Sequence, residues 1–276
     1  MWFVLLSFGL AWVPFLILLV RPGAADVAPI LMPIAPAIAC LVVRKWITRE
    51  GLGDAGLRLD LRHWPLFAVA VLWPFAASFL RVPLALVFHA APAGFSVPWG
   101  LASPSPLSLL TWSLAAIALA PIIFGEELGW RGYLQVRLLA DRPLLAGAAT
   151  GLIWGVWHYP LILVGGEQTA HPLLALLVFP LGTVTMAIFL GWLRLRTGGV
   201  WAGSVAHSAN NVTEDSLGRL AFTGHASGTY PESAWAPTQL AEMVVLLGIV
   251  VGDVLWQRRR TAGDPGDSSP RPVVAA

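Results

Sequence analysis

Three groups of polar residues interrupt stretches of the sequence that are otherwise apolar. Ionisable side chains are costly in apolar surroundings, so their presence there indicates function. Their types are carboxylate, imidazole and amide, which can activate water and stabilise a negatively charged oxygen. In chain order the groups are Glu126, Glu127 and Arg131, then Trp154 and His158, then His207 and Asn211.

Spacing within the first group predicts two different roles for the two glutamates. Glu127 and Arg131 are four residues apart, so on a helix they share a face and can form a supporting ion pair. Glu126 is turned by about 100° from Glu127 and lacks that arginine. It is therefore our candidate for a general base, the alternative being a hydrogen bond to a neighbouring helix.

The other two groups each place two side chains on one helix face. His207 and Asn211 are four residues apart and could donate two hydrogen bonds to one oxyanion, or His207 could bind a metal ion. Trp154 and His158 share the same spacing, which predicts an indole beside an imidazole. For either histidine the alternative is a structural hydrogen bond to a neighbouring carbonyl group.

Depth in a membrane indicates that the three groups meet. Glu126 lies eleven residues from Arg137, and His207 lies eleven residues from Arg196, or about 16 Å of helix in each case. His158 lies sixteen residues from Arg142, or about 24 Å before tilt and loop are allowed for. All three groups therefore fall near the middle of a roughly 30 Å hydrocarbon core, on three different helices.

One carboxylate, two imidazoles and an amide at one level predict hydrolysis. The carboxylate and one histidine would activate water, and the other histidine with the asparagine would stabilise the oxyanion. A divalent metal, Zn²⁺, held by Glu126, His158 and His207 could activate the water instead. The sequence has no HExxH motif, no phosphate-binding Walker loop and no GxSxG motif.

Composition places this chemistry in a lipid bilayer, which is the first expected partner. Hydrophobic residues make up 57% of the 276 residues and charged residues 12%, with mean hydropathy +0.73. Soluble domains carry about 25% charged residues, so a soluble enzyme, a disordered chain and a nucleic-acid-binding protein are all excluded. The single cysteine, Cys40, excludes a disulfide framework and a cysteine-based metal site.

Apolar runs predict an all-α, polytopic transmembrane helix bundle with about eight membrane helices. We divide the chain into helices 1–3 (residues 1–105), a catalytic core of helices 4–8 (106–258) and a disordered cytoplasmic tail (259–276), with a polar outer loop at 214–237. The expected spans are 2–20, 27–46, 64–90, 106–139, 143–164, 172–193, 199–212 and 239–256.

Positive charge sets the predicted orientation. With eight spans, thirteen Lys and Arg residues lie on one side and two on the other, while Arg81 and Arg131 lie within spans. This asymmetry predicts that both termini are cytoplasmic. Because the chain is rich in arginine and poor in lysine, we expect a multi-pass bacterial cell-membrane protein.

The motifs resemble those of the CAAX protease and bacteriocin-processing (CPBP, or Abi) family of intramembrane proteases, which includes type II CAAX prenyl endopeptidases. The family pattern is Glu-Glu-x-x-x-Arg, then aromatic-x-x-x-His, then His-x-x-x-Asn, on separate helices. The resemblance covers roughly residues 107–213, and Trp154 replaces the more common Phe. It implies that Glu126 and His158 activate water and that His207 and Asn211 hold the oxyanion.

The resemblance also implies that Glu127 and Arg131 support the site. The family is classed with metalloproteases, and its eukaryotic members cut prenylated CAAX proteins. We therefore expect an endopeptidase that acts on a membrane-associated protein or peptide. The alternative is a non-catalytic membrane protein, such as a bacteriocin immunity factor or a small-solute transporter.

Overall fold

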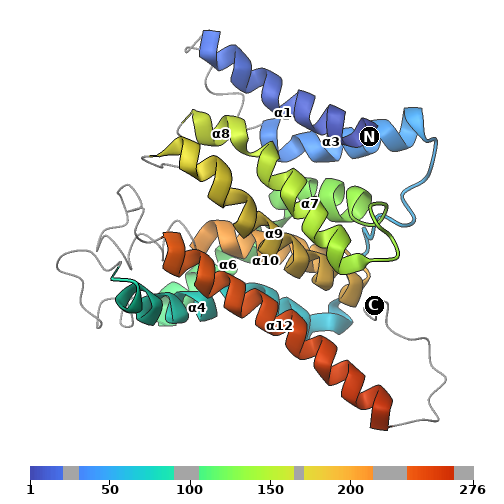
Figure 1. Cartoon of the computed structure of the whole chain (residues 1–276). Helices are drawn as coiled ribbons and strands as arrows, with labels where there is room; N and C mark the ends of the chain where they lie inside the picture. The colour runs from blue at the N-terminus through green and yellow to red at the C-terminus, as the bar shows by residue number, and fades with distance from the viewer. Residues whose placement is uncertain (21–30, 90–105, 165–170, 214–234, 264–276) are drawn as a thin grey trace.

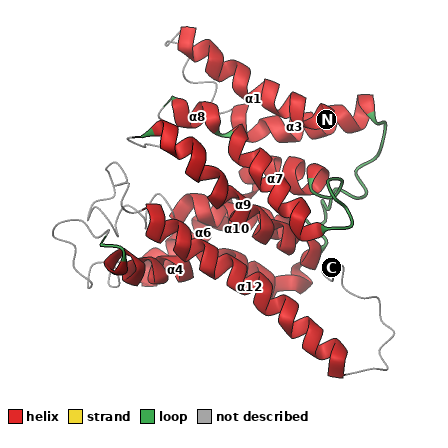
Figure 2. Ribbon diagram, in the orientation of Figure 1, coloured by secondary structure: helices red, strands yellow, loops and turns green. Residues whose placement is uncertain are grey.

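The computed structural model describes residues 1–20, 31–89, 106–164, 171–213 and 235–263, and every regular element in these ranges is helical (Figure 2). The expected all-α class is therefore confirmed. The α-helices are α1 (Trp2–Val20), α3 (Ala35–Val42), α4 (Trp64–Val87), α6 (Pro106–Gly129), α7 (Pro143–Trp157), α8 (Tyr159–Leu163), α9 (Pro172–Thr197), α10 (Trp201–Thr213) and α12 (Trp235–Gly263). Short helices of other types are η2 (Met32–Ile34), η3 (Val43–Ile47), η4 (Leu61–His63) and η5 (Trp130–Leu134).

Four helical segments of the described chain are long and apolar enough to cross a bilayer, which makes this a helical membrane protein. The remaining predicted spans are shorter or divided. The α3 helix gives way to a π-helical turn after eight residues, α7 is separated from α8, and α10 has only thirteen residues. A count of eight spans stays a prediction. The four long segments are Leu61–Val87, Pro106–Leu134, Pro172–Thr197 and Pro237–Arg259.

The boundary between α7 and α8 falls at His158, inside the expected span 143–164. Pro160 explains it, because proline lacks an N–H group and its ring clashes with the carbonyl four residues earlier. Helix α1 forms hydrogen bonds with polar groups of Trp157, next to this break. The Trp12 indole donates to the Trp157 carbonyl at 3.0 Å, and the Trp157 indole donates to the Ser7 carbonyl at 3.2 Å.

Helices α7 and α9 pack with their backbones in direct contact, through three glycines spaced four residues apart. A Cβ atom added at Gly151 would lie 2.5 Å from the Val184 Cα, and one at Gly147 would lie 3.2 Å from the Ile188 Cα. At Gly155 the Thr183 hydroxyl occupies that space. Such small-residue stripes let membrane helices approach closely. This packing fixes the position of the α7 end that carries His158.

Helix α10 is the central element of the bundle, between α6 and α4 on one side and α9 on the other (Figure 1). Every residue of α10 from Ala202 to Ala209 is buried. Small side chains make this burial possible. A Cβ atom at Gly203 would lie 3.2 Å from a Glu127 carboxylate oxygen, so α10 approaches the polar part of α6 closely.

Charged groups that the sequence placed on the cytoplasmic side gather at one end of the bundle. The Asp54 carboxylate lies 2.7 Å from Arg44 and 2.8 Å from Arg137, and its backbone carbonyl accepts a bond from Arg194 at 2.7 Å. Arg44 holds the pKa of the Asp54 carboxyl below its ordinary range. The first residue of the chain and the last turn of α12 lie on this same side, at the right in Figure 1.

Two predicted polar segments fall mostly outside the described residues, which end at 213 before the loop and at 263 before the tail. Helix α12 begins at Trp235 and ends at Gly263, so it extends a few residues into both segments. Arg81, which the sequence left without a role, is 1% exposed and lies 3.4 Å from Glu242 of α12. This ion pair joins α4 to α12.

Candidate active site

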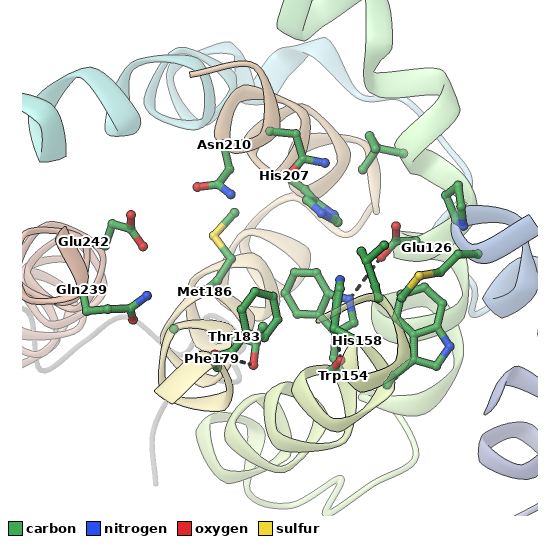
Figure 3. Close-up of a pocket in the computed structure, with 17 residues that line it drawn as sticks. Glu126, Trp154, His158, Phe179, Thr183, Met186, His207, Asn210, Gln239 and Glu242 are labelled. Atoms are coloured by element: carbon green, nitrogen blue, oxygen red, sulfur yellow. Dashed lines mark hydrogen bonds between the residues drawn. The ribbon is translucent and has the colours of Figure 1, made fainter. Parts of the chain in front are cut away.

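The three polar groups meet at one cavity of about 550 Å³ between α6, α7, α9, α10 and α12 (Figure 3). The similar depth of the three groups in the membrane, on three separate helices, predicted that they lie together. From the expected site, the residues that line the cavity are Glu126, Trp154, His158, His207 and Asn211. Glu127 and Arg131 lie behind this wall, each 0% exposed.

The Glu126 side chain is directed at the cavity and is held by one hydrogen bond. Its Oε2 atom accepts a bond from the Trp154 indole at 3.1 Å, and the residue is 7% exposed. The bond to another helix, considered as an alternative role, is therefore present. It leaves the carboxylate on the cavity wall, so the bond orients Glu126 without removing it from the site.

Glu127 joins two helices through a single oxygen. Its Oε1 atom accepts a bond from Arg131 at 2.9 Å, as the spacing predicted, and a second bond from His207 Nδ1 at 2.9 Å. The second contact was missed, because the two residues are 80 positions apart and no local spacing reports on it. Arg131 also lies 4.7 Å from the centre of the Trp154 ring.

Hydrogen bonding fixes the ring orientation of His207. A carboxylate can only accept, so Nδ1 carries the proton in its bond with Glu127. The other ring nitrogen, Nε2, is then available on the side where His207 lines the cavity. Carboxylate partners of this kind set the tautomer and direction of functional histidines.

His158 is oriented by the end of its own helix. Its backbone N–H bonds to the Gly155 carbonyl at 3.1 Å, three residues back, which leaves the Trp154 carbonyl without its usual helical donor. The His158 Nδ1 atom lies 2.9 Å from that carbonyl. Because a carbonyl only accepts, Nδ1 donates, and Nε2 carries a lone pair that can take a proton.

Aromatic rings enclose both imidazoles. The Trp154 ring centre lies 5.5 Å from that of His158 and 5.0 Å from that of His207, in edge-on arrangements. Trp157 and Phe179 each lie 5.0 Å from His158. The expected contact of Trp154 with His158 is thus present, and the same indole also contacts His207. These rings limit the movement of both histidines.

Two adjacent asparagines of α10 line the cavity, although only Asn211 was expected. Asn210 is half-buried and Asn211 is exposed. Within the described part of the chain, neither side-chain amide forms a hydrogen bond. Asn210 lies inside the His-x-x-x-Asn motif, but its position about 100° from Asn211 around the helix gave no reason to assign it a role.

A metal ion at Glu126, His158 and His207 stays a prediction. No group of three His, Cys, Asp or Glu side chains in these ranges is close enough to hold a metal ion. A catalytic zinc takes three protein ligands. The chemistry below therefore uses only the chain's own side chains.

A comparison with protein families gives a match over residues 106–213, to the model described as Rce1-like, type II CAAX prenyl endopeptidase. No curated protein matches the chain. The matched segment runs from the start of α6 to the end of α10 and includes Glu126, His158, His207 and Asn211. The helices that carry the three polar groups are therefore similar to the Rce1-like domain of type II CAAX prenyl endopeptidases.

Proposed function

We propose that the protein is an intramembrane endopeptidase that hydrolyses a peptide bond of a membrane-associated protein or peptide. The observation that supports this most is the common cavity of Glu126, His158, His207 and Asn211, with both imidazoles oriented by hydrogen bonds at Nδ1. The family match to endopeptidases agrees with it.

Water activation is assigned to Glu126 and His158. The carboxylate and the His158 Nε2 lone pair can each accept a hydrogen bond from one water molecule. As the water oxygen attacks the peptide carbonyl carbon, its proton passes to one of these two groups. The same group then donates that proton to the peptide nitrogen when the C–N bond breaks, which gives an acid and an amine.

Oxyanion stabilisation is assigned to His207 and Asn211. The electron pair of the attacked C=O bond moves onto oxygen, and the Asn211 amide N–H and His207 Nε2–H would donate to it. For Nε2 to donate while Nδ1 bonds to Glu127, His207 must be an imidazolium. Two carboxylates, Arg131 and this imidazolium then sum to zero charge, which lowers the cost of burying them together.

Direct cleavage tests the proposal. The purified protein in lipid nanodiscs should cut a fluorogenic transmembrane peptide, and Glu126→Gln should abolish turnover while the folded yield is kept. Asp141→Asn, which removes an 81% exposed carboxylate, is the matched control and should cut normally. In cells, new protein termini should appear with the wild type and not with Glu126→Gln. If the two proteins give identical termini and no peptide is cut, the proposal is wrong.

A further inference from the structure

The cavity has a second polar wall that the catalytic assignment does not use. It consists of Gln239 and Glu242 from α12 and Asn210 from α10. Figure 3 shows Gln239 and Glu242 on the side of the cavity away from Glu126. Helix α12 lies outside the segment that matches the family, so this wall is partly a feature of this chain.

The wall offers neutral amides to the cavity. Among the described residues, the side-chain amides of Gln239 and Asn210 form no hydrogen bonds, although both line the cavity. Glu242 differs, because its carboxylate lies 3.4 Å from the buried Arg81 guanidinium, which offsets its charge. A surface of this kind suits a ligand with both donors and acceptors and no net charge.

The position of Gln239 depends on a glycine in α9. A Cβ atom added at Gly182 would lie 2.7 Å from the Gln239 Oε1 and 2.9 Å from its Nε2. The amide therefore rests directly on the α9 backbone, next to the cavity residues Phe179 and Thr183. Any side chain at position 182 would move the amide.

Peptide cleavage inside a membrane creates a need for such amides. A helical substrate must unwind around the bond that is cut, which exposes backbone N–H and C=O groups. In apolar surroundings each such group without a partner costs several kcal/mol. A carboxamide has both a donor and an acceptor, so it can bond to a peptide group from the side.

We propose that Gln239 and Asn210 form a binding site for the peptide backbone of an unwound substrate segment beside the bond that is cut. This inference rests on the proposed function. The two residues recognise main-chain groups, so they contribute to binding of many sequences, and they take no part in water activation or in oxyanion stabilisation.

Binding is measured without cleavage, in the Glu126→Gln background, with a fluorescent transmembrane peptide and nanodisc-embedded protein. Loss of one neutral hydrogen bond typically weakens binding by roughly 3- to 10-fold. We expect that loss for Gln239→Leu and for Asn210→Leu. Val244→Leu is the control on the same helix, because Val244 is 51% exposed and does not line the cavity.

One further protein variant and one modified peptide keep the test independent of folding effects. Gly182→Ala should displace the Gln239 amide and weaken binding to a similar extent. A peptide in which one backbone N–H is replaced by an ester oxygen should bind the Glu126→Gln protein more weakly. When the ester stands at the peptide position that Gln239 contacts, Gln239→Leu should weaken binding of the ester peptide no further. This is expected when the two changes remove the two partners of one hydrogen bond.

With Glu126 restored, Gln239→Leu should raise KM and leave kcat within about twofold of wild type. Unchanged peptide affinity in Gln239→Leu and Asn210→Leu would overturn this inference, and cleavage by the wild type would still support the proposed function. If peptide binding depends on these two amides but the wild type never cleaves, the binding site stands and the proposed function is wrong.

Discussion

At the scale of single residues, Asn211 allows the sharpest test of mechanism. It has no titratable group, so its chemical role is to donate a hydrogen bond to the oxyanion. Loss of one such donor typically lowers the rate by on the order of 10²–10³-fold. We expect Asn211→Ala to fold, to bind the peptide nearly as before, and to turn over at least ~100-fold more slowly in single-turnover cleavage. Near-normal turnover would make Asn211 a packing residue.

The Glu127 pair allows a second test at this scale. Arg131→Ala would leave Glu127 buried with His207 as its one remaining hydrogen-bond partner among the described residues. Breaking a buried pair typically costs about 3–5 kcal/mol. We expect reduced folded yield and lost activity, whereas Glu126→Gln should keep its yield. Size-exclusion profiles of both variants check this, and the reverse pattern would mean that the two glutamate roles are exchanged.

Local spacing predicted some of these contacts and could not predict others. The Glu127–Arg131 and Trp154–His158 pairs follow from four-residue separations on one helix. The bond from Trp154 to Glu126 and the bond from His207 to Glu127 join different helices. Their formation depends on how α6, α7 and α10 pack, which a pattern along one helix does not contain.

At the scale of elements, close packing of α7 against α9 positions His158. Gly151→Ala would place a Cβ atom 2.5 Å from the Val184 Cα, which is backbone and cannot rotate away. We expect lower thermal stability and lower turnover, because the helices must separate. Gly248→Ala in α12 is the matched control, since a Cβ atom there meets nothing within 4 Å. Equal thermal stability of the two variants would contradict this packing argument.

Element boundaries show where sequence reasoning succeeds and where it fails. Helix α1 has the predicted bounds, and α9 and α10 begin within two residues of theirs, because prolines and glycines mark those ends. The span 143–164 was expected to be continuous and is divided at His158. Pro160 was the available signal, but membrane helices often retain proline, so only tertiary contacts decide whether a helix kinks or ends.

At the scale of the whole molecule, the charge network around Asp54 predicts a pH dependence. Arg44 lowers the pKa of the Asp54 carboxyl in the folded protein. The Asp54 carboxylate therefore stabilises the fold fully above the ordinary Asp pKa, and this stabilisation is lost as the pH falls through the lowered pKa. Asp54 is 53% exposed, so the effect is modest. Asp54→Asn should lower the Tm at neutral pH, and the gap to wild type should close in acid. A gap that persists unchanged at low pH would contradict this.

The orientation of the whole bundle can be tested by the same charges. Three arginines of the predicted cytoplasmic set, Arg44, Arg137 and Arg194, meet the segment around Asp54. Positively charged loops remain on the cytoplasmic side of bacterial membranes. An alkaline phosphatase reporter fused after Arg260 should therefore be inactive, and a fluorescent protein at the same site should be bright. A reporter inserted after Ser216, in the predicted outer loop, is the matched control and should show the opposite pattern. An active phosphatase after Arg260 would mean that the number of spans is odd or that the bundle is inverted.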